Sequence, residues 1–282
     1  MAHDARRRMT RLFLAALAWL LLPWAMPPMG QVARAATGVE RLHQRVAALA
    51  LRPVPPLAAL RAQCREDTLC AARLLARALG PRARLQRISH PDTDAIRLVR
   101  VRRSITSARR LADGGLQVEL RRFGIKAVAE MRAVLHKQKG TRRIVIDLRR
   151  NGGGNVARML RIAALFTGPL RRAVRLRTAA GERWLDVPAP AQPPLPLPGS
   201  RGSHMAHIEL LVGPGTASSA EILAALLRRH AGARMLGRRT HGKNWLSSAV
   251  PVGHDWQLLV PSAIIEVPGE TLSGGLRPDA AM

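Results

Sequence analysis

The chain has 282 residues, of which 47% are hydrophobic and 23% charged, which excludes a wholly disordered protein and leaves room for one large or two small domains. Its 46 basic residues, 42 of them arginine, face 18 acidic ones, and the formal charge of +28 favours anionic partners. Because the arginines are spread along the whole chain and only 3% of residues are aromatic, we expect no specific nucleic-acid site, and contact with an anionic envelope surface is peripheral at most.

The first 35 residues have the pattern of a secretory signal peptide. Arginines precede an apolar run over residues 12–22, and the small residues Ala33 and Ala35 come three residues and one residue before a cleavage site at Ala36. The run is short and prolines follow it, which disfavours a membrane span, although an uncleaved N-terminal anchor is the alternative. The sequence therefore predicts an exported protein of the periplasm or cell envelope.

Residues 36–82 form a predicted helical N-terminal segment, because apolar residues recur there at helical spacings. Its Cys64 and Cys70 are the only cysteines of the chain. In an oxidising compartment they can pair across the five residues between them, which ties down a helical turn or a loop. Two cysteines without a nearby histidine supply too few ligands for a metal ion. We therefore expect a disulfide here and no metal.

Residues 83–115 connect this segment to a regular pattern that begins at residue 116. The connecting segment is rich in arginine, with one candidate strand over 96–101 and a turn over 113–115. Further along, a proline-dense stretch over 187–199 indicates a loop or an extended connector. A run of short strands is expected after the last helix.

Strands and helices alternate within residues 116–282. The expected strands cover residues 116–120, 144–148 and 207–212, and the expected helices cover residues 127–138, 156–166 and 217–229. Strands that alternate with helices of this length are typical of a sheet covered by helices. The sequence therefore predicts an α/β domain.

The first of two glycine-containing junctions joins an expected strand to an expected helix with the sequence DLRRNGGG over residues 147–154. Three consecutive glycines let the backbone approach a ligand closely, and amides at the start of a helix point outward as donors. The junction lacks the Lys-Ser/Thr ending of a phosphate-binding loop. Taken alone, it fits a ligand-binding turn and a merely tight turn equally well.

The second junction has the sequence GPGTASSAE over residues 213–221. Serines at a helix start are commonly N-caps, but the same position suits a nucleophile, because the helix dipole and free amides stabilise a developing oxyanion. A nucleophile needs a base, and Lys243 follows 25 residues after Ser218. A desolvated lysine can lose its proton, whereas an arginine cannot. Because the chain uses arginine about ten times as often as lysine, a lysine at this position indicates a role that arginine cannot fill.

Together these motifs resemble the carboxyl-terminal processing peptidases, also called tail-specific proteases, a family of secreted endopeptidases with a Ser–Lys dyad. Four motifs occur in the family's order: the turn over 147–154, the serine motif over 215–221, the pair Gly242-Lys243, and the closing sequence GLRPD over 275–279. The resemblance covers about residues 116–282. It implies an α/β core related to the crotonase and ClpP folds.

The resemblance also assigns residues by position. It implies that Ser218 is the nucleophile and Lys243 the general base. The backbone amides of Gly154 and Ser219 would form the oxyanion hole. The implied mechanism is acyl transfer on protein or peptide substrates, and it requires no metal or organic cofactor.

The chain departs from the family's pattern in three places. Many members insert a substrate-binding PDZ domain before the catalytic core, and residues 83–115 are too few for one. Many members have a glutamine four residues after the lysine, which helps to orient it, where this chain has Ser247, whose hydroxyl has a shorter reach. The family's aromatic residue before Gly-Lys is His241 here, which we interpret as a packing residue. Asp147 and Glu221 are interpreted as structural.

The sequence thus predicts an exported serine endopeptidase and leaves two alternatives open. A catalytically silent, protease-like fold that binds peptide or a hydrophobic ligand would fit the short connecting segment and Ser247. A basic envelope protein that binds polyanions or lipid surfaces would fit the net charge.

Overall fold

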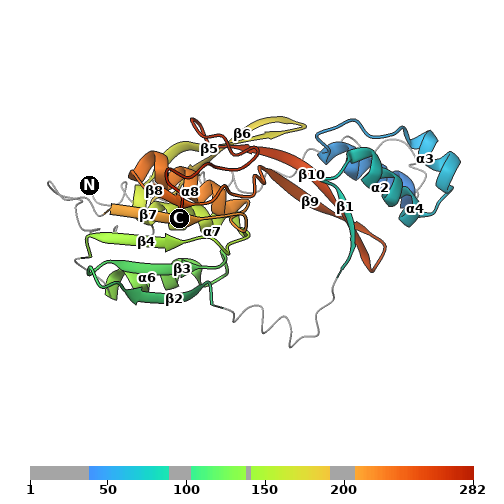
Figure 1. Cartoon of the computed structure of the whole chain (residues 1–282). Coiled ribbons are helices and arrows are strands. Elements are labelled where there is room, and N and C mark those ends of the chain that lie inside the picture. Colours follow the sequence, from blue (N-terminus) through green and yellow to red (C-terminus); the bar gives the residue numbers. More distant parts are fainter. Residues whose placement is uncertain (1–37, 89–102, 138–140, 191–206) are drawn as a thin grey trace, which may run out of the picture. The chain divides into compact units, whose positions relative to one another are not determined.

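A computed structural model describes residues 38–88, 103–137, 141–190 and 207–282 (Figure 1). The expected signal peptide over 1–35, the candidate strand over 96–101 and most of the proline-dense stretch lie outside the described residues. Within the described ranges, every helix is too short or too polar to cross a lipid bilayer.

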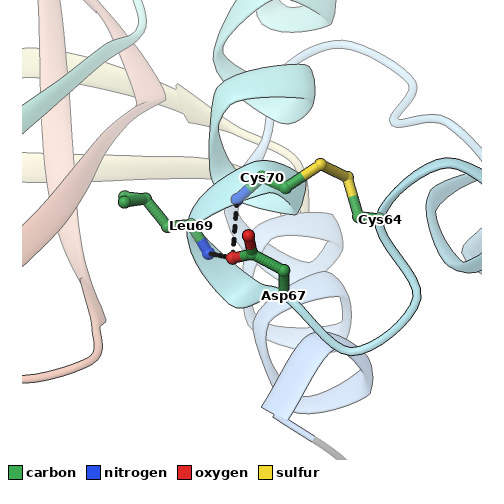
Figure 2. Close-up of a disulfide and its surroundings, with 4 residues drawn as sticks. All are labelled: Cys64, Asp67, Leu69 and Cys70. Atoms are coloured by element: carbon green, nitrogen blue, oxygen red, sulfur yellow. Dashed lines mark hydrogen bonds between the residues drawn. A yellow bond between two sulfur atoms is a disulfide. The ribbon is translucent and has the colours of Figure 1, made fainter.

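Three helices make up the N-terminal segment: α2 (Gly38–Leu49), α3 (Leu57–Cys64) and α4 (Thr68–Leu79). Figure 2 shows how the short turn between α3 and α4 is held. The carboxylate of Asp67 accepts hydrogen bonds from the backbone amides of Leu69 and Cys70 at 2.8 and 3.0 Å, which caps the start of α4. A disulfide joins Cys64 to Cys70 across the same turn, and a covalent link of this kind restricts the unfolded chain.

The first sheet has the strand order β1-β10-β5-β6, with β9 also paired to β10, and all its pairs are antiparallel. Its strands are β1 (Arg84–Arg87), β5 (Leu170–Thr178), β6 (Gly181–Val187), β9 (Trp245–Val252) and β10 (Trp256–Glu266). Helices α2 and α4 contact β9 and β10. Buried residues of α2–α4 join four strand residues in one hydrophobic cluster, here called the N-terminal cluster; the four are Val250, Val252, Leu258 and Val260.

The second sheet has the strand order β2-β3-β4-β7-β8. Its strands are β2 (Ile105–Arg110), β3 (Leu116–Leu120), β4 (Arg143–Asp147), β7 (His207–Val212) and β8 (Arg234–Gly237). Strands β3, β4, β7 and β8 pair in parallel, and β2 is antiparallel to β3. Such parallel pairs need crossover connections, and helices α6 (Ala127–Lys137), α7 (Val156–Thr167) and α8 (Ser219–Ala231) lie in them. The predicted α/β fold is therefore confirmed.

The core of this part is a second hydrophobic cluster, here called the sheet cluster. It collects buried residues of α6, α7 and α8, of the parallel strands, and of β5 and β10. Helix α8 is buried almost all round, because most of its residues from Ser219 to Leu227 are inaccessible to solvent. A helix that is buried in this way holds the backbone at its first residue in a fixed position.

Two features of the first sheet differ from the sequence-based expectation. The hairpin of β5 and β6 was not expected, because its alternating arginines resemble the unpatterned basic stretches elsewhere in the chain. The strands after α8 are also not all short, since β10 spans 11 residues. A proline disfavours a long strand, but the pairing of β10 with β9 shifts in register between Pro261 and Ala263, and a bulge at this point lets the strand continue.

Candidate active site

The two glycine-containing junctions meet at one edge of the second sheet. They follow β4 and β7, which are neighbouring parallel strands with Asp147 opposite Leu211. The carboxyl ends of parallel strands lie at the same edge, which is where α/β sheets place their sites. The junctions also contact each other directly: the amide of Ala217 donates to the carbonyl of Asn151 at 3.0 Å, and the hydroxyl of Ser219 donates to the carbonyl of Gly154 at 2.8 Å.

Asn151 fixes the shape of the first junction from inside. Its side chain is fully buried. The Nδ2 group donates to the carbonyl of Leu120 at 2.9 Å, and Oδ1 accepts from the amide of Gly153 at 2.9 Å. Sequence reasoning treated Asn151 only as part of a motif. Its role is to tie the glycine turn to the end of β3.

Gly153 lies directly against the candidate nucleophile. Its φ is 100°, a region that residues with a side chain rarely adopt. A Cβ atom added there would lie 2.9 Å from the Cβ of Ser218 and 3.1 Å from the amide nitrogen of Ser219. Only glycine therefore allows the two junctions to approach this closely.

We expect Gly153→Ala to lower the free energy of unfolding by about 2–3 kcal/mol, because the new methyl group combines backbone strain with a clash. Gly152→Ala is the matched control, since a Cβ at Gly152 would meet nothing within 4 Å and its φ is not positive. Urea denaturation of the two variants measures the difference. Equal stabilities would contradict this packing of the glycine turn.

Ser218 is held in a strained conformation at the turn into α8. Its φ is 58° and its ψ is −122°, and only Arg65, Arg172 and Ser218 among the described non-glycine residues have positive φ. Ser218 occupies the N-cap position of α8, and Glu221 accepts from its amide as in a capping box. Its dihedrals nevertheless differ from the extended ones of an ordinary N-cap residue. Strain of this kind costs about 1–3 kcal/mol and is typical of a serine that a strand-to-helix turn exposes for reaction.

Glu221 joins the serine turn to the lysine segment. Its side chain is fully buried in the first turn of α8. One carboxylate oxygen, Oε2, accepts from the amides of Ser218 and Lys243 at 2.8 and 2.9 Å. The other, Oε1, accepts from the amide of Gly242 at 2.6 Å and from the hydroxyl of Thr240 at 2.5 Å. Sequence reasoning assigned Glu221 a structural role in its helix but did not foresee that it fixes both halves of the expected dyad.

The side chain of Lys243 is half-buried and points toward an aromatic ring. Its Nζ lies 5.9 Å from the centroid of the Trp245 ring. In the described part of the chain, no hydrogen bond joins Nζ to the hydroxyl of Ser218. Ser247 lies on β9 with an exposed side chain, and within the same ranges it makes no hydrogen bond to Lys243. The structure thus brings the backbones of Ser218 and Lys243 together and leaves Ser247 apart.

The two residues whose amides are expected in the oxyanion hole are joined by a hydrogen bond. Ser219 is the first residue of α8, where helix amides lack partners within the helix. The hydroxyl of the same residue bonds the carbonyl of Gly154. This bond holds the backbones of the two residues together beside Ser218.

Among the other titratable groups, Arg149 and Asp147 have a structural role at the first junction. Arg149 forms a salt bridge with Asp147 at 2.7 Å, and the hydrogen bonds to this carboxylate raise the pKa of Arg149. Burial, together with the charge of Arg229, lowers the pKa of His230, but His230 is in the last turn of α8, at the opposite end from Ser218. His241 is exposed. Among the described residues, no three histidine, cysteine or acidic side chains form a group that could hold a metal ion.

The closing motif over 275–279 supports the lysine segment. The amide of Leu276 donates to the hydroxyl of Thr240 at 2.7 Å, and the amide of Thr240 donates back to the carbonyl of Leu276 at 3.1 Å. Asp279 accepts from the amide of Met235 at 2.7 Å. Because Thr240 also bonds Glu221, the motif braces the segment that carries Lys243.

The chain is similar to curated proteases and spans less than half the length of each. The carboxyl-terminal-processing protease of Picosynechococcus sp. is 27% identical over 199 residues, which cover 64% of this chain and 44% of that protein. A probable CtpA-like serine protease of Staphylococcus haemolyticus is 25% identical over 126 residues, or 44% of this chain and 24% of that protein.

Solved structures share the fold over most of the chain. A lipoprotein from Streptococcus agalactiae superposes with a TM-score of 0.62 at 16% identity and covers 93% of this chain and 95% of its own. A putative peptidase from Parabacteroides merdae superposes with a TM-score of 0.55 at 14% identity and covers 87% of this chain and 89% of its own. At such identities the likeness concerns the fold alone. The model of Peptidase family S41 matches residues 116–282, more than half of the chain, and the chain therefore belongs to this family.

Proposed function

We propose that the protein is an exported serine endopeptidase that hydrolyses peptide bonds with Ser218 as the nucleophile and Lys243 as the general base. The observation that carries this proposal is the arrangement around Glu221. This carboxylate holds the strained backbone of Ser218 and the backbone of Lys243 at 2.8 and 2.9 Å from one oxygen. A nucleophile and a base on separate elements are thus fixed to a common point.

The proposed reaction begins with Lys243 in its neutral form. Its amine accepts the hydroxyl proton of Ser218, while Oγ attacks the carbonyl carbon of the peptide. The amides of Gly154 and Ser219 stabilise the oxyanion. The ammonium of Lys243 then protonates the leaving amine, and an acyl-enzyme remains on Ser218. Water, activated by the same lysine, hydrolyses this ester and releases the acid product.

Export and substrate class belong to the same proposal. The signal-like sequence over 1–35 supports transport out of the cytoplasm, and the family supports protein or peptide substrates. Family membership does not favour the binding of polyanions as the main function. The high positive charge can instead concentrate acidic substrates at the surface.

The test compares the chain without residues 1–35 with its Lys243→Arg variant, using casein as an unstructured substrate. We expect the wild type to cleave and Lys243→Arg to be slower by about 100- to 10,000-fold, because arginine keeps its proton and cannot act as a base. Lys126→Arg, an exchange at an exposed lysine, is the control and should cleave like the wild type. Full activity of Lys243→Arg would disprove the dyad, and an inactive wild type would favour the silent, ligand-binding alternative.

A further inference from the structure

Two cations from distant parts of the chain share the ring of Trp245. The Nζ of Lys243 lies 5.9 Å from the ring centroid, and the guanidinium carbon of Arg82 lies 4.6 Å from it. Both distances are within the range in which a cation is attracted to an aromatic face. Lys243 precedes Trp245 by two residues, whereas Arg82 belongs to the turn between α4 and β1.

The position of the ring is fixed from several sides. Trp245 is the first residue of β9 and pairs with Ile264 of β10. Next to it, the amide of Ile265 donates to the carbonyl of Asn244 at 2.8 Å. Arg82 and Ile264 also line a cavity of about 430 Å³, together with residues from the ends of α2 and α4. The ring thus stands where the N-terminal segment meets the strands that follow Lys243.

The side chain of Lys243 needs such a support. Within the described residues, neither Ser218 nor Ser247 bonds its amine, and a lysine side chain left free loses rotamer entropy when it is placed for reaction. Proton transfer is sensitive to this placement, since a displacement of 1 Å can cost about 100-fold in rate. The ring restricts the space that the amine explores, next to a backbone that Glu221 already ties to Ser218.

We propose that Trp245 is a positioning residue for Lys243 and that Arg82 steadies its ring, so that the N-terminal helical segment takes part in placing the general base. This inference rests on the proposed function. In this chain, Trp245 thereby fills the orienting role for which the sequence offered only Ser247.

The test measures kcat and KM for peptide cleavage and the rate at which a fluorophosphonate labels Ser218. We expect Trp245→Leu to lower kcat and the labelling rate about 10-fold with KM within about twofold of the wild type. Trp245→Phe retains an aromatic face and should recover most of the loss. Arg82→Gln, at an exposed residue, should lower kcat about threefold and serves as the second variant if Trp245→Leu folds poorly.

A similar pair at the other end of the pairing between β9 and β10 provides the control. The guanidinium carbon of Arg87 lies 5.7 Å from the centroid of the Trp256 ring. These two residues are partners in the pairing of β1 with β10, and neither is next to Lys243 in sequence. Arg87→Gln should leave kcat and the labelling rate within about twofold. Titration of labelled sites corrects every variant for its folded fraction.

The outcomes separate the two proposals. If the wild type cleaves and is labelled at Ser218, but Trp245→Leu and Arg82→Gln match it per labelled site, the positioning role is disproved and the dyad stands. An increase in kcat would mean that the ring retains Lys243 in an unproductive position, which also overturns the inference. If wild-type protein neither cleaves nor is labelled at Ser218, the proposed function fails and the inference fails with it.

Discussion

Ser218→Ala is expected to reduce the kcat for peptide cleavage by about a million-fold, to the level of the assay background. The variant lacks the hydroxyl oxygen that attacks the substrate. The amides of Gly154 and Ser219 remain in place, so substrate binding should persist. Cleavage of casein, followed by gel electrophoresis and by release of amino groups, measures the loss, and circular dichroism checks that the fold is retained.

Ser219→Ala distinguishes the two adjacent serines. The hydroxyl of Ser219 bonds the carbonyl of Gly154 at 2.8 Å, and the residue is fully buried, so its loss should weaken the site without removing the nucleophile. We expect reduced but measurable cleavage. If Ser219→Ala were inactive while Ser218→Ala still cleaved, the nucleophile would be Ser219 and the assignment from the motif would be wrong.

Glu221→Ala is expected to lower the free energy of unfolding by about 4 kcal/mol and the melting temperature by about 10 °C. The variant leaves four donors without their acceptor: the amides of Ser218, Gly242 and Lys243 and the hydroxyl of Thr240. Buried donors without partners cost about 1–3 kcal/mol each, and relaxation recovers part of this sum. Urea and thermal denaturation measure both quantities.

Activity should fall together with stability in Glu221→Ala, by more than about 100-fold per folded molecule, because the turns that carry Ser218 and Lys243 are no longer held to one point. Glu119→Ala is the control. Glu119 is partly exposed and forms a salt bridge with Arg121 at 3.1 Å. Such pairs contribute less than about 1 kcal/mol to the free energy of unfolding. Similar losses in both variants would contradict the special role of Glu221.

Local patterns predicted the elements whose residues alternate regularly between core and surface. The strands over 116–120 and 207–212 coincide with β3 and β7, since apolar residues repeat there at the spacing of a half-buried or fully buried strand. Helix α7 begins at Val156, as expected. The apolar residues of this helix define the face that is buried, and the preceding Asn155, its N-cap, defines where it begins.

Contacts between distant residues could not be predicted in the same way. Glu221 and Lys243 are 22 residues apart, and Arg82 and Trp245 come from opposite ends of the described chain. No periodicity relates such positions, and only the pairing of β9 with β10 and the crossover through α8 bring them together. The order of the motifs indicated the family, whereas the bonds that hold the site required the fold.

Strand β10 has a practical consequence for any attempt to isolate the family-matching region. It contributes Leu258 and Val260 to the N-terminal cluster and Ala263 and Ile265 to the sheet cluster. A polypeptide trimmed to residues 116–282 would expose the first pair to water and leave bare the edge of β10 that β1 normally covers. Uncovered apolar strands associate with one another. Truncation at the family boundary would therefore yield an aggregating fragment, and a soluble preparation must retain α2, α3 and α4.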